Sequence, residues 1–259
     1  MFTSYVQGAD AVLVASELDA RRFGMAIGRY TLPLDDATDA SAVAETVLAG
    51  DFEIVILRAA AARGDLERDL RAHPALEVLR ADTLRYWRRD AALPSHPAPV
   101  RGAATELATV RIATLADRAG IERVARLAFD GYGTHYRANP RFDDRLVADG
   151  FCEWAVSGLG RVGATTLVVD TGRGVSGFLL ADRAGDALEI ALNAVAPEAE
   201  GRGLYAALLA RTLEIAAAEG GRAVWISTQA DNARAMRAWE RLAFAPAFDL
   251  MTLHVMRRS

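Results

Sequence analysis

The chain has 259 residues and a formal net charge of −4; 52% of its residues are hydrophobic and 25% are charged. These proportions are typical of a globular protein, and the lack of a basic footprint argues against nucleic-acid binding. A single cysteine excludes an intrachain disulfide, and without a long apolar run or an apolar leader the sequence predicts a cytoplasmic protein with no membrane partner.

The first 90 residues alternate short apolar runs with helical patterns, which predicts a small α/β domain over 1–90. Whether it is a truncated relative of the fold of the second domain stays open. Its strands are predicted over 25–32, 53–57, 76–79 and 84–87, and its helices over 37–49 and 65–72. Three prolines within 91–104 prevent a continuous helix or central strand there, so this segment is predicted to be a linker.

The second predicted domain spans 105–259. Its strands are predicted to begin at 109 and to cover 165–169, 175–181, 186–195 and 223–228. Helices are predicted over 117–128 and 145–158, from 204 up to the glycine pair at 220–221, and from Asp231 or Asn232 to about 242.

Two glycines mark the join between the strand over 186–195 and the next helix, in the segment V-A-P-E-A-E-G-R-G-L-Y at 195–205. Gly201 and Gly203 let the backbone approach a ligand closely and turn its N–H groups outward. Bare N–H groups at a helix start suit a phosphate or pyrophosphate. The alternative is an ordinary strand–turn–helix whose glycines serve only the turn.

This segment and a second one resemble the GCN5-related N-acetyltransferase (GNAT) superfamily. The family's acetyl-CoA motif, V-x-P-x-x-Q-G-x-G-[IL]-[GA], aligns with 195–205, with Glu200 at the usual Gln and Tyr205 at the usual Gly or Ala. A downstream pattern, N-x-x-A-x-x-x-[YF]-x-x-x-x-F, aligns with Asn232, Ala235, Trp239 and Phe244. The resemblance covers about residues 107–255.

The resemblance implies an α/β fold of the α+β type, with a mixed twisted sheet flanked by helices, and acetyl-CoA as co-substrate without a metal. It also implies that the strand ending at Val195 pairs with the pantetheine arm and that the glycine turn holds the pyrophosphate. The residues placed at the cofactor are Asn193, Val195, Gly201, Arg202, Gly203, Leu204, Tyr205 and Asn232. For Arg202 the alternative is a solvated turn residue, and for Asn232 it is a helix N-cap.

Two short segments resemble bacterial dTDP-4-amino-4,6-dideoxyhexose N-acetyltransferases of the dTDP-fucosamine type. They are S-E-L-D-A-R-R-F-G-M-A-I-G-R at 16–29 and H-Y-R-A-N-P-R-F-D-D at 135–144. The resemblance implies that arginines hold the nucleotide diphosphate and that aromatic rings stack on the base or sugar, with a solvated loop as the alternative. The predicted substrate-binding residues are Tyr132, Tyr136, Arg137 and Arg141.

Acetyl transfer to an ammonium group needs a base and a donor to the thioester oxygen. Glu189 shares one strand face with Asn193 and Val195 and is the first candidate base, with an exposed strand carboxylate as the alternative. His135 is the second, with a satisfied loop histidine as the alternative. A backbone N–H near Val195 is the predicted oxyanion donor. Relatives usually carry a tyrosine acid where this chain has Trp239, whose indole is no acid.

The sequence therefore favours an N-acetyltransferase that moves an acetyl group from acetyl-CoA to a nucleotide-linked amino sugar, by direct attack of the amine on the thioester. One alternative is the same chemistry on another small amine, such as an amino acid, an antibiotic or a secondary-metabolite intermediate. Another is a catalytically silent CoA-binding regulator. The N-terminal domain could shape the acceptor site or form a homodimer, and both options stay open.

Overall fold

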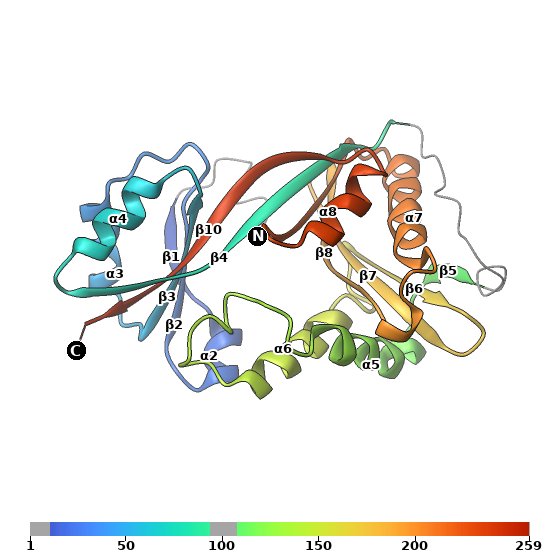
Figure 1. The fold of residues 1–259 in the computed structure, drawn as a ribbon, viewed down its shortest axis with the longest axis horizontal. Helices are drawn as coiled ribbons and strands as arrows, with labels where there is room; N and C mark the ends of the chain where they lie inside the picture. The colour runs from blue at the N-terminus through green and yellow to red at the C-terminus, as the bar shows by residue number, and fades with distance from the viewer. Residues whose placement is uncertain (1–10, 94–107, 259) are drawn as a thin grey trace.

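The computed structural model describes residues 11–93 and 108–258, and within them ten strands form one mixed, twisted sheet (Figure 1). The order across the sheet is β1-β2-β3-β10-β4-β9-β8-β7-β6-β5. In chain order the strands are β1 (Val12–Ala15), β2 (Ile27–Thr31), β3 (Ile54–Ala60), β4 (Leu76–Asp90), β5 (Thr109–Ile112), β6 (Ala164–Asp170), β7 (Val175–Ala184), β8 (Ala187–Val195), β9 (Ala223–Gln229) and β10 (Ala245–Arg257). A mixed sheet flanked by helices confirms the predicted fold class.

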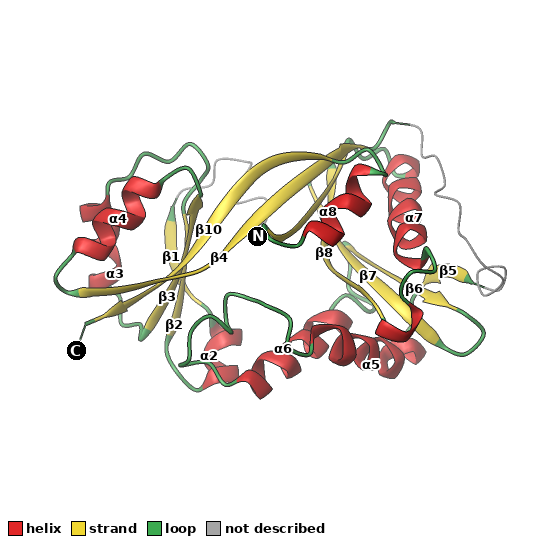
Figure 2. Cartoon of the chain, in the orientation of Figure 1, coloured by secondary structure: helices red, strands yellow, loops and turns green. Residues whose placement is uncertain are grey.

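Helices cover both faces of the sheet (Figure 2), and α5 and α7 each contact both β7 and β8. The helices are α2 (Glu17–Phe23), α3 (Ala40–Ala49), α4 (Gly64–Ala72), α5 (Arg118–Phe129), α6 (Asp144–Val156), α7 (Leu204–Ala218) and α8 (Ala233–Glu240), with 3-10 turns η1 (Leu115–Asp117) and η2 (Pro197–Ala199). The longest, α7, buries Leu204, Leu208, Leu209 and Leu213 against the sheet at the spacing that its sequence predicts.

Two long strands, β4 and β10, join the N-terminal and C-terminal halves of the chain (Figure 1). β10 lies between β3 and β4, which are neighbours in sequence, and pairs with both. The sheet therefore crosses the predicted boundary between 1–90 and 105–259. That division into domains stays a prediction, and most of the linker predicted over 91–104 lies outside the described residues.

The prediction of two short strands over 76–79 and 84–87 is wrong, because β4 runs through both as one strand of 15 residues. The polar residues between them belong to the strand. Thr252 is opposite Asp82 and Leu253 is opposite Arg80, so Ala81 is an extra residue that forms a β-bulge. The periodicity is broken at 80–83 because this stretch combines the bulge with a polar face that borders a cavity.

β8 and β9 diverge after a short parallel pairing. Their register runs from Ala187 opposite Ala223 to Ile190 opposite Ile226 and then stops, while β9 continues its pairing with β4 up to Gln229. A β-bulge at Ala191, which lies between the partners of Leu180 and Ala181, bends β8 where the two strands separate. The edge of β8 that faces β9 is therefore open from Ala191 to Val195.

The sequence patterns do not predict β1 or α2, because each is short and mostly exposed on its outer side. The strand β10 is not predicted either. Apart from β4, the remaining helices and strands agree with the prediction to within a few residues at their ends. Over residues 11–93 and 108–258, the structure has no helix with the length and apolar character needed to span a membrane.

Candidate functional site

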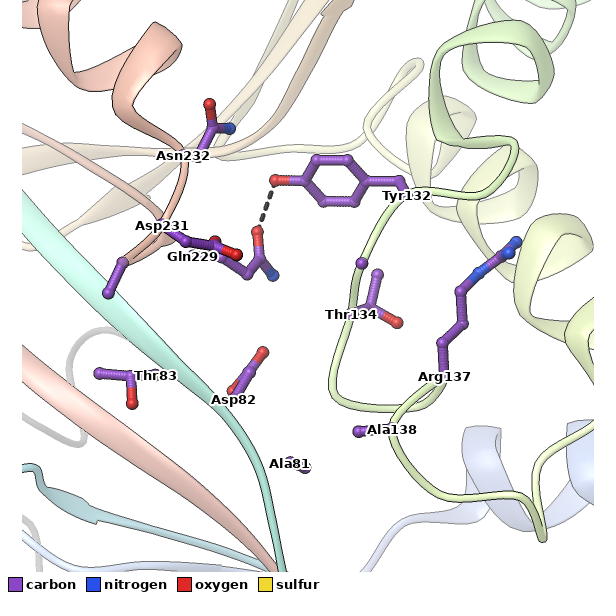
Figure 3. Close-up of a pocket in the computed structure, with 12 residues that line it drawn as sticks. Ala81, Asp82, Thr83, Tyr132, Thr134, Arg137, Ala138, Gln229, Asp231 and Asn232 are labelled. Carbon is purple, nitrogen blue, oxygen red and sulfur yellow. Dashed lines mark hydrogen bonds between the residues drawn. The ribbon is translucent and has the colours of Figure 1, made fainter.

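A cavity of about 1190 Å³ lies between one face of the sheet and the segments that cover it. Its walls come from both halves of the chain: α2, β3 and β4 on one side, and the 132–136 loop, α6, β8, β9 and the starts of α7 and α8 on the other. A smaller cavity of about 710 Å³ adjoins it, between β4 and the 132–138 loop (Figure 3). The residues that line both are Asp82, Tyr132, Thr134, Gln229 and Asn232.

The glycine turn has the predicted strand–turn–helix geometry at one end of the larger cavity. Gly201 and Gly203 have φ angles of 74° and 79°, in the left-handed region that favours glycine. Gly203 is the N-cap of α7 and offers no side chain to satisfy the first N–H groups of that helix. The positive end of α7 and its bare N–H groups therefore face the cavity mouth, which is an arrangement that can hold a pyrophosphate.

The side chains of this turn make contacts of their own. Arg202 is exposed and donates a hydrogen bond to the carbonyl of Glu198 (3.0 Å). Glu200, at the position where relatives have Gln, forms an ion pair with Arg234 (2.7 Å). Leu204 is buried in the core and offers only its backbone. The predicted phosphate site is thus built from backbone groups, and Arg202 sits where its alternative reading, a solvated turn residue, would place it.

Asn232 is the N-cap of α8, as one of its two predicted roles requires. Its Oδ1 accepts a hydrogen bond from the backbone N–H of Ala235 (3.1 Å), and its Nδ2 donates to Thr228 Oγ1 (2.9 Å). The residue lines both cavities at the same time. The cap therefore fixes the side chain at the end of β9, and the predicted contact with the CoA arm stays a prediction.

Trp239 and Tyr205 form a hydrogen-bonded pair across the gap between α8 and α7. The indole Nε1 of Trp239 donates to the hydroxyl of Tyr205 (2.8 Å), and both residues line the larger cavity. Burial raises the pKa of Tyr205 above its usual range, so the phenol stays protonated at neutral pH. The hydroxyl oxygen of Tyr205 accepts the hydrogen bond from Trp239, so its O–H is not used in this contact and can donate into the cavity.

Three predicted residues of β8 line the larger cavity: Glu189, Asn193 and Val195. Glu189 precedes the bulge at Ala191 and is opposite Asp182 on β7 and Trp225 on β9. Asn193 and Val195 follow the bulge, on the part of β8 that no longer pairs with β9. The position of the carboxylate and the open strand edge fit a base and an oxyanion donor, and these two roles stay predictions.

The two tyrosines of the 132–136 loop, both predicted to bind the substrate, form hydrogen bonds with different parts of the molecule. The hydroxyl of Tyr132 bonds to the side chains of Thr228 and Gln229, so the tyrosine ties the loop to the end of β9 (Figure 3). The hydroxyl of Tyr136 donates to Asp19 Oδ1 (2.8 Å) and accepts from Arg29 Nη2 (2.7 Å). Burial raises the pKa of Tyr136 to about 12. Tyr136 thus connects the loop to α2 and β2.

His135 ends a chain of buried hydrogen bonds that fixes its tautomer. The backbone N–H of Arg141 donates to Asn139 Oδ1 (3.0 Å), so Asn139 Nδ2 is the donor to His254 Nδ1 (3.2 Å). His254 then carries its proton on Nε2 and donates to His135 Nδ1 (3.0 Å). With Nδ1 accepting, a neutral His135 carries its proton on Nε2.

The same hydrogen bonds do not favour His135 as the base, and its catalytic role stays a prediction. Burial, with the charge of Arg58, lowers the pKa of His135 well below its usual range, and burial lowers that of His254 to about 4. Both rings are therefore neutral at pH 7. His135 lines the larger cavity as an N–H donor, without a free lone pair for a proton.

The two predicted arginines do not come together. Arg137 lines the smaller cavity (Figure 3), whereas Arg141 is 44% exposed, lies 3.7 Å from the carboxylate of Glu77 and lines neither cavity. Asn139 accepts a hydrogen bond from the backbone N–H of Arg141, whose side chain is exposed beside Glu77. The structure therefore does not bring Arg141 to either cavity, and its predicted contact with the substrate stays a prediction.

The polar residues of the larger cavity that sequence reasoning misses include Asp19, Arg29 and Asp82. Asp19 and Arg29 lie within 16–29, the segment that resembles the amino-sugar acetyltransferases. That resemblance indicates the segment but predicts no role for either residue. Asp82 lies in the polar stretch of β4 that periodicity leaves outside any strand. In the described part of the chain, no group of three or more His, Cys, Asp or Glu residues is arranged to hold a metal.

Comparison with known proteins agrees with this geometry. Residues 129–244 match the acetyltransferase (GNAT) family. A GCN5-related N-acetyltransferase from Sphaerobacter thermophilus is 15% identical with a TM-score of 0.61, covering 95% of this chain and 76% of that chain. A conserved protein of unknown function from Staphylococcus epidermidis is 14% identical with a TM-score of 0.60, covering 97% and 93%.

A tandem GNAT protein from the clavulanic acid biosynthesis pathway is 11% identical with a TM-score of 0.52, covering 89% of this chain and 75% of that chain. No curated protein matches the sequence. At these identities the solved structures establish a shared fold, and the family match adds the chemistry. The match over residues 129–244 supports an acetyltransferase domain of the GNAT type in this part of the chain and, with these solved structures, identifies the protein as an acetyl-CoA-dependent acyltransferase.

Proposed function

We propose that the protein is an N-acetyltransferase whose acceptor is a small amine bound in the cavity between the two halves of the chain. The observation that carries this proposal is the divergence of β8 from β9, which opens directly into that cavity beside the glycine turn. An acetyl donor laid along the open edge of β8 would present its thioester to an amine that enters from the N-terminal side. Both substrates then meet without a covalent enzyme intermediate.

The residues present fit the parts of acetyl-CoA. The backbone N–H groups from Gly201 to Tyr205 would hold the pyrophosphate, and the open edge of β8 would pair with the pantetheine amides. A backbone N–H near Val195 would stabilise negative charge on the thioester oxygen as the amine attacks. Glu189 would take the proton of the amine, directly or through water.

Tyr205 would donate a hydrogen bond to the departing sulfur of CoA. Its O–H, oriented by the indole of Trp239, can donate a hydrogen bond to a thiolate. A thiol is already a fair leaving group near neutral pH, so this donor assists departure without having to transfer its proton completely. Trp239 is thus compatible with catalysis and does not by itself favour a catalytically silent regulator.

We further propose an amino sugar as the first acceptor class to test. The two segments that carry this resemblance, 16–29 and 135–144, contact each other at the cavity. Tyr136 bonds to Asp19 and Arg29, and the rings of Phe23 and Phe142 lie 4.6 Å apart. Their contact supports a joint role in forming the acceptor end of the cavity.

One observation favours a different small amine. The arginines predicted to hold a nucleotide diphosphate are separated, with Arg137 at the smaller cavity and Arg141 outside both. A cavity of about 1190 Å³ that also admits the acetyl arm would suit a free amino sugar, an amino acid or a metabolite amine.

Thiol release from acetyl-CoA tests these proposals. We would assay dTDP- and UDP-linked amino sugars, free amino sugars, amino acids and aminoglycosides in parallel. Turnover confined to nucleotide sugars would support the narrower proposal, and turnover with free amines alone would support the alternative. Binding of acetyl-CoA without turnover of any amine would contradict the proposed function.

A further inference from the structure

The carboxylate of Asp82 is buried without a hydrogen-bond partner among the residues that the structure describes. Asp82 lies on β4 in a row with Leu84 and Tyr86, and all three side chains line the larger cavity, as expected for the two-residue period of a strand. Figure 3 shows the carboxylate pointing from β4 into the smaller cavity, on the side that faces the 132–138 loop. The carboxylate is therefore directed at the space that the two cavities share.

Carboxylates on the neighbouring strand and helix, unlike that of Asp82, are paired with arginines. Asp249 on β10 is held by Arg85 through two hydrogen bonds of 2.7 and 2.8 Å, and Glu67 on α4 is held by Arg71 and Arg80. A buried carboxylate without such a partner is costly, because it loses its water and gains nothing in exchange. A cation that enters the cavity from outside would supply the missing partner.

The charged residue that shares the cross-strand row of Asp82 is an arginine two strands away. Thr252 on β10 lies directly opposite Asp82, and Arg58 on β3 lies opposite Thr252 on its other side. The two charged residues are thus separated by a full strand, about 10 Å between strand axes.

Asp82 lies close to where the acetyl group would be presented. Leu84, two residues along β4, is opposite Gln229 at the end of β9, and the backbone N–H of Ala230 donates to the carbonyl of Thr83 (2.8 Å). This end of β9 borders the opening from which β8 has diverged. A cation bound at Asp82 therefore sits at the acceptor side of the opening.

The loop opposite Asp82 offers hydrogen-bond donors to an oxygen. Thr134 is 7% exposed and its Oγ1 has no partner among the described residues, and His135 presents an N–H fixed by His254 and Asn139. Both residues line the larger cavity, and Thr134 also lines the smaller one. A hydroxyl or an anionic oxygen is the group that such donors bind.

We propose that Asp82, Thr134 and His135 form the acceptor site, and that this site takes a cationic amine bearing a hydroxyl or anionic oxygen close to the nitrogen. Asp82 binds the ammonium group, and Thr134 and His135 bind the oxygen. Amino sugars, amino alcohols and amino acids belong to this class, whereas plain alkylamines do not. The inference rests on the proposed acetyl transfer and specifies its acceptor.

The first test compares Asp82→Asn with Asp249→Asn, a carboxylate paired outside the cavities. With the best acceptor from the thiol-release panel, Asp82→Asn is expected to raise the acceptor KM roughly tenfold and to leave the acetyl-CoA KM unchanged. Its Tm is expected to stay level or rise, because a buried carboxylate without a partner has been removed. Asp249→Asn is expected to lower Tm slightly and to leave both KM values unchanged.

Two outcomes would overturn the role of Asp82: an unchanged acceptor KM in Asp82→Asn, or an equal rise in Asp249→Asn. If Asp82→Asn does not fold, Asp82→Ser replaces it in the same assay. Absence of turnover in the wild-type protein with every amine would instead contradict the proposed function, so the two failures are distinguishable.

The second test concerns the oxygen. Glucosamine and cyclohexylamine are both ring amines, and only glucosamine has hydroxyls beside the nitrogen. As competitors of the best acceptor, glucosamine is expected to bind the wild-type protein roughly tenfold more tightly, and Thr134→Val is expected to reduce that difference. Equal inhibition by the two amines in the wild-type protein would overturn the oxygen-binding role, as would an undiminished difference in Thr134→Val.

Discussion

The two ends of the larger cavity are built in different ways. At the cofactor end, the glycine turn, the start of α7 and the open edge of β8 contribute mainly backbone groups. At the proposed acceptor end, the lining consists of side chains such as the buried His135 and the half-buried Asp82 and Tyr136, and Tyr136 connects its loop to α2 and β2. A backbone site serves a co-substrate that is always the same, whereas a side-chain site can be altered to suit a particular amine.

The largest effect is expected where the cofactor end depends on a bare helix start. Gly203→Asp places a negative charge at the N-cap of α7, where it competes with the pyrophosphate for the same N–H groups. We expect the acetyl-CoA KM to rise on the order of 100-fold. Gly203→Asn, which carries the same backbone strain at φ 79° without the charge, is the control. Equal effects of the two variants would show that strain, and not charge, is responsible.

At the acceptor end, acidification is expected to cost stability. The pKa of His254 is lowered to about 4 in the folded protein. At pH values between this pKa and that of the unfolded chain, the unfolded chain binds a proton at His254 and the folded chain does not. The free energy of unfolding therefore keeps its full value above the unfolded pKa of about 6.5. As the pH falls toward about 4, protonation of this residue lowers it by roughly 3 kcal/mol. His135 acts in the same direction.

Denaturant unfolding at several pH values between 7 and 4.5 would measure this loss. His254→Gln is expected to flatten the dependence, while His73→Gln, outside this cluster, is expected to leave it as in the wild type. A wild-type stability that does not change over this interval would contradict the neutral, buried histidine pair.

Between the two ends, Tyr205 is expected to affect the chemical step alone. Tyr205→Phe removes the O–H that can meet the departing thiolate and leaves the indole of Trp239 without its acceptor. We expect kcat to fall roughly 10- to 100-fold with little change in either KM, because a hydrogen bond to a charged group contributes about 1.5–3 kcal/mol. Single-turnover rates would measure it. An unchanged rate would leave Tyr205 as a packing residue.

The smallest effect is expected for Arg141. Arg141→Ala removes an exposed side chain outside both cavities, so every KM is expected to change by less than about twofold. Arg137→Ala, at the smaller cavity, is the matched variant and is expected to have the greater effect on acceptor KM. A large effect of Arg141→Ala on nucleotide-sugar acceptors alone would support its predicted role.

The same contrast explains what could be predicted from the sequence. The cofactor end is encoded by residues with strong local preferences: Gly201 and Gly203 for positive φ, Asn232 for a helix cap, and alternating apolar residues for β8. These preferences act over a few residues, so a local pattern is sufficient to predict the geometry. The predicted functional roles of these residues await the experiments above.

The acceptor end could be predicted only in part, because its geometry depends on contacts between distant segments. The pairing of His135 with His254 and of Tyr136 with Asp19 spans more than 100 residues, and no local spacing indicates it. Asp82 lies on a bulged, polar part of β4 that has neither strand nor helix periodicity. The role predicted for Arg141 rests on a short resemblance, and in the structure this side chain is exposed and lines neither cavity.

The position of β10 has a consequence for how the protein acquires its structure. Strands β3 and β4 are made early during synthesis, yet each has β10 as a direct neighbour, and β10 is separated from β4 by more than 150 residues. Until that late strand arrives, the N-terminal strands lack the partner that completes their sheet. Non-local pairing of this kind folds slowly. We therefore expect a nascent chain that ends before β10 to depend on chaperones, and both halves to gain protection from hydrogen exchange together.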